Sequence, residues 1–311
     1  MSRFSSRLGG VTRFHPDLRA GGRWLPKAAI GRRSAALTQA LVRRIPDQAG
    51  FTEHRVSATA SVLVHRPEGL GDRAPALLWI HGGGLVIGSP LQDAATLRRV
   101  ADLTGAVVAL VRYRLAPANP YPAALDDCSA ALEWLANQPG VDPARVAVGG
   151  ASAGGGLAAA TVLAARESGG PPVCLQLLVY PMLDDRTAAR PDPDAAYRRV
   201  WSNKSNRFGW TSYLGRPPGS ADVDQLAAPG RCTDFAGLPP TWIGIGTLDL
   251  FHDECLAYAA GLDAAGVPTE TTVIPGAYHG FDAVQSRSGV AKGFLDAQVT
   301  ALRTAFGTNG S

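Results

Sequence analysis

A serine in a glycine-rich turn is the residue of this sequence best placed for nucleophilic chemistry. Ser152 stands in Gly150-Ala151-Ser152-Ala153-Gly154, a G-x-S-x-G string between the apolar run RVAVGG and the small-residue run GGLAAATVLAA. A strand, a sharp turn and a helix in this order expose a serine hydroxyl at the carboxyl edge of a sheet, near the positive end of the helix dipole. The glycines let strand and helix approach closely. We therefore predict that Ser152 is a nucleophile.

A serine hydroxyl becomes reactive only when a base takes its proton, and a histidine late in the chain is the candidate. His279, in PGAYHGFD, follows the last strand-like run on a loop, whereas His252 lies at a helix start. A carboxylate must then orient the imidazole. Asp249 directly follows the run TWIGIG, at the same sheet edge as the serine, while Asp253 falls at the start of the next helix. The predicted triad is Ser152, Asp249 and His279, in the chain order Ser…Asp…His.

Three consecutive glycines can supply the donors that this chemistry needs. His81-Gly82-Gly83-Gly84 follows the apolar run ALLWI. Because glycines leave backbone N–H groups unshielded, we predict that Gly83 and Gly84, with Ala153, form an oxyanion hole for the alkoxide produced by nucleophilic attack. His81 is expected to fix this loop beside the substrate rather than to act chemically. We expect neither a metal nor a cofactor.

Strand-like and helix-like segments alternate along the chain. The strand-like runs are short, unalternating and rich in Val, Ile and Leu, which is typical of central parallel strands buried on both faces. Their alternation with helices predicts a doubly wound, mostly parallel α/β sheet flanked by helices. Residues 51–65 alternate in polarity and predict an antiparallel edge hairpin. The other predicted strands are 76–80, 106–111, 145–149, 173–180, 241–246 and 270–274, and the predicted helices are 122–137, 153–167, 253–265 and 289–306.

Two segments do not fit the alternation and are predicted to be additions to the sheet. Residues 1–47 are basic and helix-like, and residues 184–226 are rich in Asp, Arg, Pro and aromatic residues. We expect these two segments to form a helical cap over a core made of residues 48–183 and 227–311. A serine at a sheet edge needs a water-poor pocket above it. The residues predicted to bind substrate in this pocket are His81, Leu85, Trp201, Phe208 and Phe281.

Composition and charge exclude several classes of protein. Hydrophobic residues make up 46% of the 311 residues and charged residues 18%, which is normal for a globular protein. No apolar run approaches the roughly 20 residues that span a bilayer, and the N-terminus lacks the apolar core of a secretory signal. Four scattered cysteines, at 128, 174, 232 and 255, are expected to be reduced thiols, consistent with a cytoplasmic protein.

The net charge of +4 is unevenly distributed, because residues 1–50 alone carry +8. We expect this segment to be a solvated flap with at most weak contact to an anionic membrane surface. No basic motif interleaved with aromatic residues supports nucleic-acid binding.

The combination of motifs resembles the bacterial hormone-sensitive lipase family, which are HGGG-type esterases of the α/β-hydrolase superfamily. The similar stretches lie at 81–84 (HGGG), 113–127, 181–187, 206–215, 237–254 and 278–282 (YHGFD). The resemblance covers about residues 67–281. It implies the α/β-hydrolase fold with an eight-stranded sheet, a helical cap, and hydrolysis of short to medium acyl esters without a cofactor. Two positions depart from the family pattern, since Ala151 replaces its usual Asp and Ala118 its usual Glu.

The leading functional hypothesis is a serine carboxylesterase that forms an acyl-enzyme intermediate and takes a small-molecule ester as its partner. An amide or peptide hydrolase on the same fold is an alternative, because a triad does not discriminate between these substrates. A non-catalytic small-molecule receptor is a second alternative, which the presence of Ser152, Asp249 and His279 disfavours. The sequence leaves a homodimer open.

Overall fold

A mixed sheet forms the centre of the molecule. The computed structural model describes residues 13–25, 30–42, 44 and 50–308, and within them eight strands pair in the order β1-β2-β4-β3-β5-β6-β7-β8. All neighbours from β4 to β8 are parallel, while β1, β2 and β4 pair antiparallel. The predicted parallel sheet and edge hairpin are therefore confirmed. The strands are β1 Thr52–Arg55, β2 Ser61–His65, β3 Ala74–Ile80, β4 Val107–Arg112, β5 Val141–Ala151, β6 Leu175–Val179, β7 Thr241–Gly246 and β8 Thr269–Ile274.

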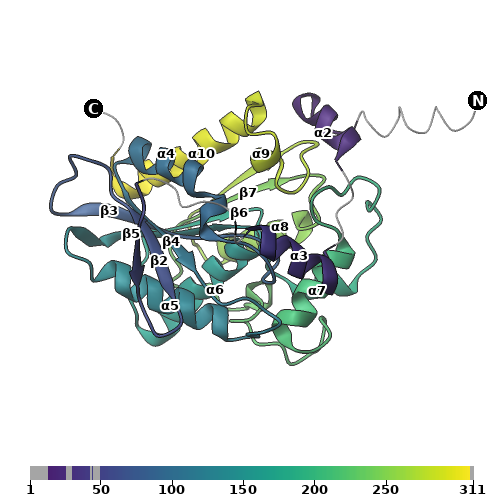
Figure 1. The fold of residues 1–311 in the computed structure, drawn as a ribbon, viewed down its shortest axis with the longest axis horizontal. Helices are drawn as coiled ribbons and strands as arrows, with labels where there is room; N and C mark the ends of the chain where they lie inside the picture. Colours follow the sequence, from purple (N-terminus) through teal and green to yellow (C-terminus); the bar gives the residue numbers. More distant parts are fainter. Residues whose placement is uncertain (1–12, 26–29, 43, 45–49, 309–311) are drawn as a thin grey trace, which may run out of the picture.

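Helices cover both faces of this sheet (Figure 1). On one face α4 and α10 pack against the sheet and each other, and on the opposite face α5 and α6 do so, with α8 beside β7 and β8. Connections that alternate between the two faces produce the doubly wound arrangement. The helices are α2 Arg19–Trp24, α3 Arg32–Val42, α4 Ala94–Thr104, α5 Ala123–Ala136, α6 Ala153–Ser168, α7 Asn203–Leu214, α8 His252–Ala264, α9 Phe281–Val284 and α10 Gly289–Phe306.

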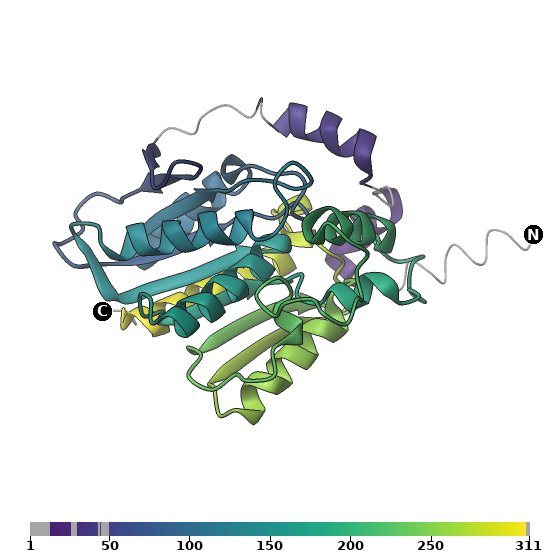
Figure 2. The ribbon, with the colours of Figure 1, turned by 90° about the horizontal axis from the view of Figure 1, so that it is seen from below.

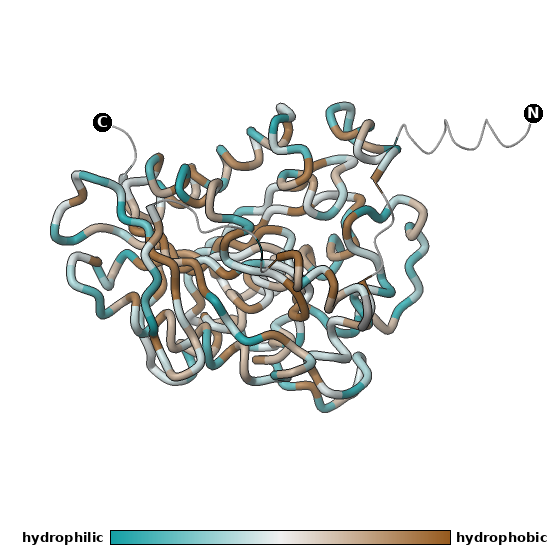
Figure 3. The backbone as a smooth tube through the Cα atoms, in the orientation of Figure 1, coloured by the Kyte–Doolittle hydropathy of each residue, from teal (hydrophilic) through white to brown (hydrophobic). Residues whose placement is uncertain are grey.

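The core lies between the helices and the central strands, where hydrophobic stretches gather (Figure 3). Every residue of β3, β6 and β7 is buried, as their unalternating apolar sequences predict. The edge strand β8 alternates between half-buried and exposed residues. The buried central strands therefore form a well-packed support for the loops at their carboxyl ends.

Helix α4, strand β5 and the short helix α9 differ from the sequence prediction, and α9 was not predicted at all. Helix α4 was not predicted, although its buried residues Leu97, Val100, Ala101 and Thr104 follow helical spacing. Arginines interrupt that apolar pattern on its solvent side. Strand β5 begins at Val141, before Pro143, and its pairing with β3 shifts register between Ala74 and Ala76. The irregular pairing accommodates a proline that would otherwise interrupt a central strand.

Helices α2, α3 and α7 come from the two segments predicted to be additions. Helices α3 and α7 lie near each other on the side of the molecule where the parallel strands end (Figures 1 and 2), whereas α2 lies beside α9 (Figure 1), and its Gly21 faces Tyr278 and Gln285. The N–H of Ile30 donates to Oγ of Ser205 on α7 at 2.7 Å. Gln39 on α3 both donates to the carbonyl of Gly88 and accepts from its N–H, at 3.0 and 2.7 Å. These contacts tie α3 and the residue Ile30 before it to the insertion and to the loop after β3. Within the described part of the chain, every helix is too short or too polar to cross a bilayer.

Candidate active site

Ser152 occupies the turn between β5 and α6 in a backbone conformation that is unusual for a serine. Its φ is 57° and its ψ −121°, and its N–H donates to the carbonyl of Val179 at 2.9 Å. A methyl group on Gly150 or Gly154 would overlap backbone carbonyl oxygens, so the tight approach of strand and helix requires glycine at both positions. This strained turn projects the serine side chain over the sheet edge, at the positive end of the helix dipole of α6.

The structure brings the three predicted triad side chains into one chain of hydrogen bonds. Nε2 of His279 lies 2.8 Å from Oγ of Ser152, and Nδ1 of His279 lies 2.8 Å from Oδ2 of Asp249. The other oxygen of Asp249 accepts from the N–H of Phe251 at 3.0 Å. A carboxylate oxygen only accepts, so Nδ1 carries the imidazole proton and Nε2 is free to accept the serine proton. All three residues are buried.

Asp253 and His252 lie apart from this arrangement. Both belong to the first turn of α8, and the Asp253 side chain is 97% exposed. The Nδ1 atom of His252 bonds this carboxylate at 2.8 Å. Since Asp249 alone of the two carboxylates contacts His279, the geometry favours it as the orienting group.

Two aromatic rings that the sequence analysis did not select enclose His279. Tyr180 and Phe251 both present edge-to-face contacts to the imidazole, with centroid distances of 4.8 and 5.2 Å. The hydroxyl of Tyr180 donates to Oδ1 of Asp282 at 2.9 Å. These contacts restrict rotation of the imidazole and keep water away from it. Their only signal in the sequence is position, because Tyr180 directly follows β6 and Phe251 closely follows the acid.

The glycine loop after β3 lies against the serine, as an oxyanion hole requires. A methyl group on Gly82 would come within 3.3 Å of Cβ of Ser152. Gly83 and Gly84 have φ of 125° and 60°, values that glycine adopts freely. None of the hydrogen bonds found between described residues uses the N–H of Gly83, Gly84 or Ala153. These donors are therefore available for a developing oxyanion beside Ser152.

The side chain of His81 holds the glycine loop in place. Its Nδ1 donates to the carbonyl of Gly82 at 2.8 Å, and its ring stacks on Tyr113 with a centroid distance of 4.3 Å. The Tyr113 hydroxyl in turn donates to the carbonyl of His81 at 2.9 Å. Burial lowers the pKa of His81 to about 4, so the ring is neutral near pH 7. This geometry suits a residue that fixes the loop.

The residues predicted to bind substrate occupy different places. His81 and Phe208 border a groove of about 710 Å³ between α3 and the loops around residues 86–91 and 112–119. Trp201 lies over Gly84, where an added methyl group would overlap its ring. Leu85 is buried, with its carbonyl accepting from Ala116 at 2.9 Å. Phe281 is fully buried and packs on Phe294 at 5.0 Å, so its ring faces the core rather than an open pocket.

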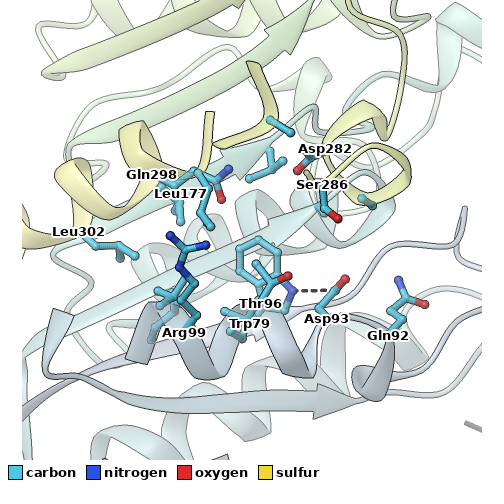
Figure 4. Close-up of a pocket in the computed structure, with 18 of the residues that line it drawn as sticks. Trp79, Gln92, Asp93, Thr96, Arg99, Leu177, Asp282, Ser286, Gln298 and Leu302 are labelled. Carbon is cyan, nitrogen blue, oxygen red and sulfur yellow. Dashed lines mark hydrogen bonds between the residues drawn. The ribbon is translucent and has the colours of Figure 1, made fainter. Parts of the chain in front are cut away.

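Ala151, one of the two departures from the family pattern, borders a cavity of about 200 Å³ on the α4 and α10 side of the sheet (Figure 4). Two carboxylates face this space, Asp93 and Asp282, and the indole N–H of Trp79 donates to Asp93 at 2.9 Å. Burial raises the pKa of Asp93 to about 6 and raises that of Asp282. The alanine thus leaves room in a place that already holds two acids. The second departure, Ala118, borders the groove beside α3.

The described residues contain no group of three or more His, Cys, Asp or Glu side chains arranged to hold a metal ion. The four cysteines, all in the described part of the chain, are free thiols. The arrangement that the structure does contain is a hydroxyl, a base that can accept its proton, a carboxylate behind the base, and unpaired backbone donors. Such a set can perform nucleophilic attack on an acyl carbon.

The chain is similar to known proteins in both sequence and structure. Residues 77–283 match a family model described as α/β hydrolase fold. The chain is 38% identical over 216 residues to the esterase LipI of Mycobacterium tuberculosis, covering 67% of this chain and 66% of LipI. It is 36% identical over 229 residues to the carboxylesterase NlhH of the same species, covering 71% and 70%. The aligned stretch thus spans about two thirds of the length of these relatives.

A solved structure titled bacterial heroin esterase superposes with a TM-score of 0.85 at 34% identity. The superposition covers 95% of this chain and 99% of that one. The similarity therefore includes both the sheet and most of the segments at its carboxyl edge.

Proposed function

This chain belongs to the α/β-hydrolase fold family, in the branch of hormone-sensitive-lipase-type esterases, and we propose that it hydrolyses carboxylic esters through Ser152, His279 and Asp249. The carboxylesterase class follows from the family and its named members. The observation that supports the triad is the continuous pair of 2.8 Å contacts from Asp249 through His279 to Ser152. No cofactor enters this proposal.

The reaction takes two steps on these residues. His279 accepts the proton of Ser152 as Oγ attacks the ester carbonyl carbon, and the N–H groups of Gly83, Gly84 and Ala153 bind the oxyanion. His279 then protonates the leaving alcohol, which departs and leaves the acyl group on Oγ. A water molecule, deprotonated by His279, attacks the acyl-enzyme, and the acid leaves as Ser152 recovers its proton.

Substitution of the nucleophile tests the mechanism. Ser152→Ala should lose at least two orders of magnitude in turnover, since a triad member is missing, and should no longer react covalently with a fluorophosphonate probe. Ser168→Ala, at the exposed end of the same helix, is the matched control and should keep both activities. Unchanged ester hydrolysis by Ser152→Ala, with circular dichroism showing an intact fold, would contradict the proposed nucleophile.

We further propose that the substrates carry short to medium acyl chains. The insertion packs tightly on the glycine loop beside the serine, because Trp201 covers Gly84 and Gly209 on α7 abuts the carbonyl of Gly84. Each buried methylene contributes about 0.8 kcal/mol until the pocket is full. The specificity constant should rise from acetate to about butyrate or hexanoate and then fall. A maximum at about twelve carbons or beyond, or strong activation at an emulsion surface, would indicate a true lipase instead.

A further inference from the structure

One buried ion pair of the insertion reaches the loop that carries the acid. Arg198 and Asp192 both belong to residues 184–226, and their side chains are only 11% and 6% exposed. The guanidinium Nε lies 3.1 Å from each carboxylate oxygen, and Nη2 donates to Oδ1 at 2.8 Å. A two-point contact of this kind fixes both the position and the plane of the guanidinium.

The third nitrogen of that guanidinium, Nη1, bonds to a residue outside the insertion. Nη1 of Arg198 donates to the backbone carbonyl of Asp249 at 2.8 Å. The other contact to this carbonyl, from the N–H of His252, is long at 3.4 Å. Arg198 thus makes the shorter of the two contacts to the backbone carbonyl of Asp249, whose carboxylate bonds His279.

We infer that Arg198 is a positioning residue, which holds Asp249 in place against His279 and makes the alignment of the acid depend on the seated cap insertion. This inference rests on the proposed triad. Asp249 sits in the turn between β7 and α8, held at its N–H by Gly246 at 3.1 Å. With the peptide groups on both sides of Asp249 held by hydrogen bonds, the backbone of this residue has little freedom to rotate. The carboxylate of Asp249 consequently stays within 2.8 Å of Nδ1 of His279.

A second buried ion pair, between Asp185 in the insertion and Arg231 just after it, provides a matched control. Arg231 and Asp185 are also buried, with side chains 12% and 0% exposed, and Arg231 also contacts both carboxylate oxygens, at 2.6 and 3.1 Å. The other bonds of Arg231 go to the carbonyls of Ser220 and Ala221, away from the triad. Removing either arginine leaves a buried aspartate unpaired, so both changes should lower the thermal midpoint. Of these two arginines, only Arg198 contacts Asp249.

The test compares Arg198→Gln with Arg231→Gln on a nitrophenyl ester. Arg198→Gln should lower kcat by about 10- to 100-fold with KM within about twofold, because a misplaced catalytic group slows the chemical step. Arg231→Gln should leave kcat within about twofold of the unmodified protein. Equal kcat in the two variants, at similar loss of thermal stability, would overturn the positioning role.

A double-mutant cycle separates positioning from a general structural effect. If Arg198 acts through Asp249, then Arg198→Gln should change kcat by less than about twofold in an Asp249→Asn background. A loss of kcat that is the same in both backgrounds would overturn the inference. Should Arg198→Gln not fold, Arg198→Lys serves in the same cycle, since lysine keeps the charge beside Asp192 but lacks the planar fork.

The cycle also shows which proposal has failed. Full activity in Asp249→Asn alone would contradict the triad itself. A large loss in Asp249→Asn together with an unaffected Arg198→Gln would contradict only the role of Arg198.

Discussion

Replacing Asp249 by asparagine exchanges one carboxylate oxygen for an NH₂ group and should nevertheless remove most activity. The two carboxylate oxygens of Asp249 both accept hydrogen bonds, from Nδ1 of His279 at 2.8 Å and from the N–H of Phe251 at 3.0 Å. An asparagine has one acceptor and one NH₂ group for these two places. If its oxygen accepts from Phe251, its NH₂ faces Nδ1 of His279. The imidazole then carries its proton on Nε2 and cannot accept the proton of Ser152.

The opposite orientation of the asparagine restores the tautomer but places NH₂ against the N–H of Phe251. Leaving a buried donor unpaired costs about 1–3 kcal/mol, so the productive orientation should be populated about 5- to 150-fold less. The negative charge that stabilises the imidazolium during attack is lost in either orientation. Together these effects predict a fall in kcat of about 10³- to 10⁴-fold, equivalent to about 4–5 kcal/mol of barrier.

Initial rates of nitrophenyl acetate hydrolysis by Asp249→Asn and Asp253→Asn provide the measurement. Asp253 has a side chain 97% exposed, so Asp253→Asn should stay within about twofold of the unmodified protein. Thermal unfolding should show that both variants are folded. A fall of less than about tenfold in Asp249→Asn, or a larger fall in Asp253→Asn, would refute the assignment of the acid.

Further predictions concern the glycine loop, a helix and a buried acid. Gly84→Ala should lower kcat by about 10²- to 10³-fold, because the added methyl group would overlap the Trp201 ring and displace an oxyanion donor. The φ of +60° at this position also disfavours alanine. Hydrolysis rates compared with the unmodified protein check this, and an unchanged rate would count against the donor role. Gly293 lies on α10 with open space around it, so Gly293→Ala should keep activity and raise the free energy of unfolding by about 0.5–1 kcal/mol. Urea unfolding measures this change. A lower free energy of unfolding would contradict the view that Gly293 is an open position in a helix. Burial raises the pKa of Glu254 to about 8, so the folded protein keeps a proton that the unfolded chain releases above its ordinary pKa of 4.5. The free energy of unfolding should therefore fall as pH rises from about 4.5 to 8, and Glu254→Gln should reduce this fall. Thermal midpoints measured across this pH range test the prediction. The same dependence on pH in both proteins would contradict it.

Much of the fold could be predicted from local sequence. The predicted bounds of β7 and α10 agree with the structure residue for residue, because Thr241–Gly246 is a continuous apolar run and Gly289–Phe306 keeps helical spacing. Helix α4 was missed because arginines on its solvent side interrupt the apolar run, although its buried residues keep helical spacing. The predicted strand begins at residue 145, whereas irregular pairing with β3 extends β5 back to Val141, across Pro143.

The sequence by itself predicted a candidate triad and determined the sheet edge at which its residues lie. Parallel strands end at one edge, so residues that closely follow β5 and β7, such as Ser152 and Asp249, lie at the same edge of the sheet. A glycine loop after β3 reaches the same edge for the same reason. His279 follows β8 and joins them. Chain order and strand periodicity are local properties, and they can be read from residue types.

Only the tertiary structure decided which side chains surround that chemistry. The Phe281 ring faces the core and Trp201 covers Gly84, although both are aromatic residues near the site. Arg198 lies 51 positions before Asp249, in a segment whose path follows no strand or helix periodicity. Contacts of this kind depend on how an irregular insertion packs on a finished sheet. The physical reason is that packing is decided by the sum of many long-range contacts, which no local pattern records.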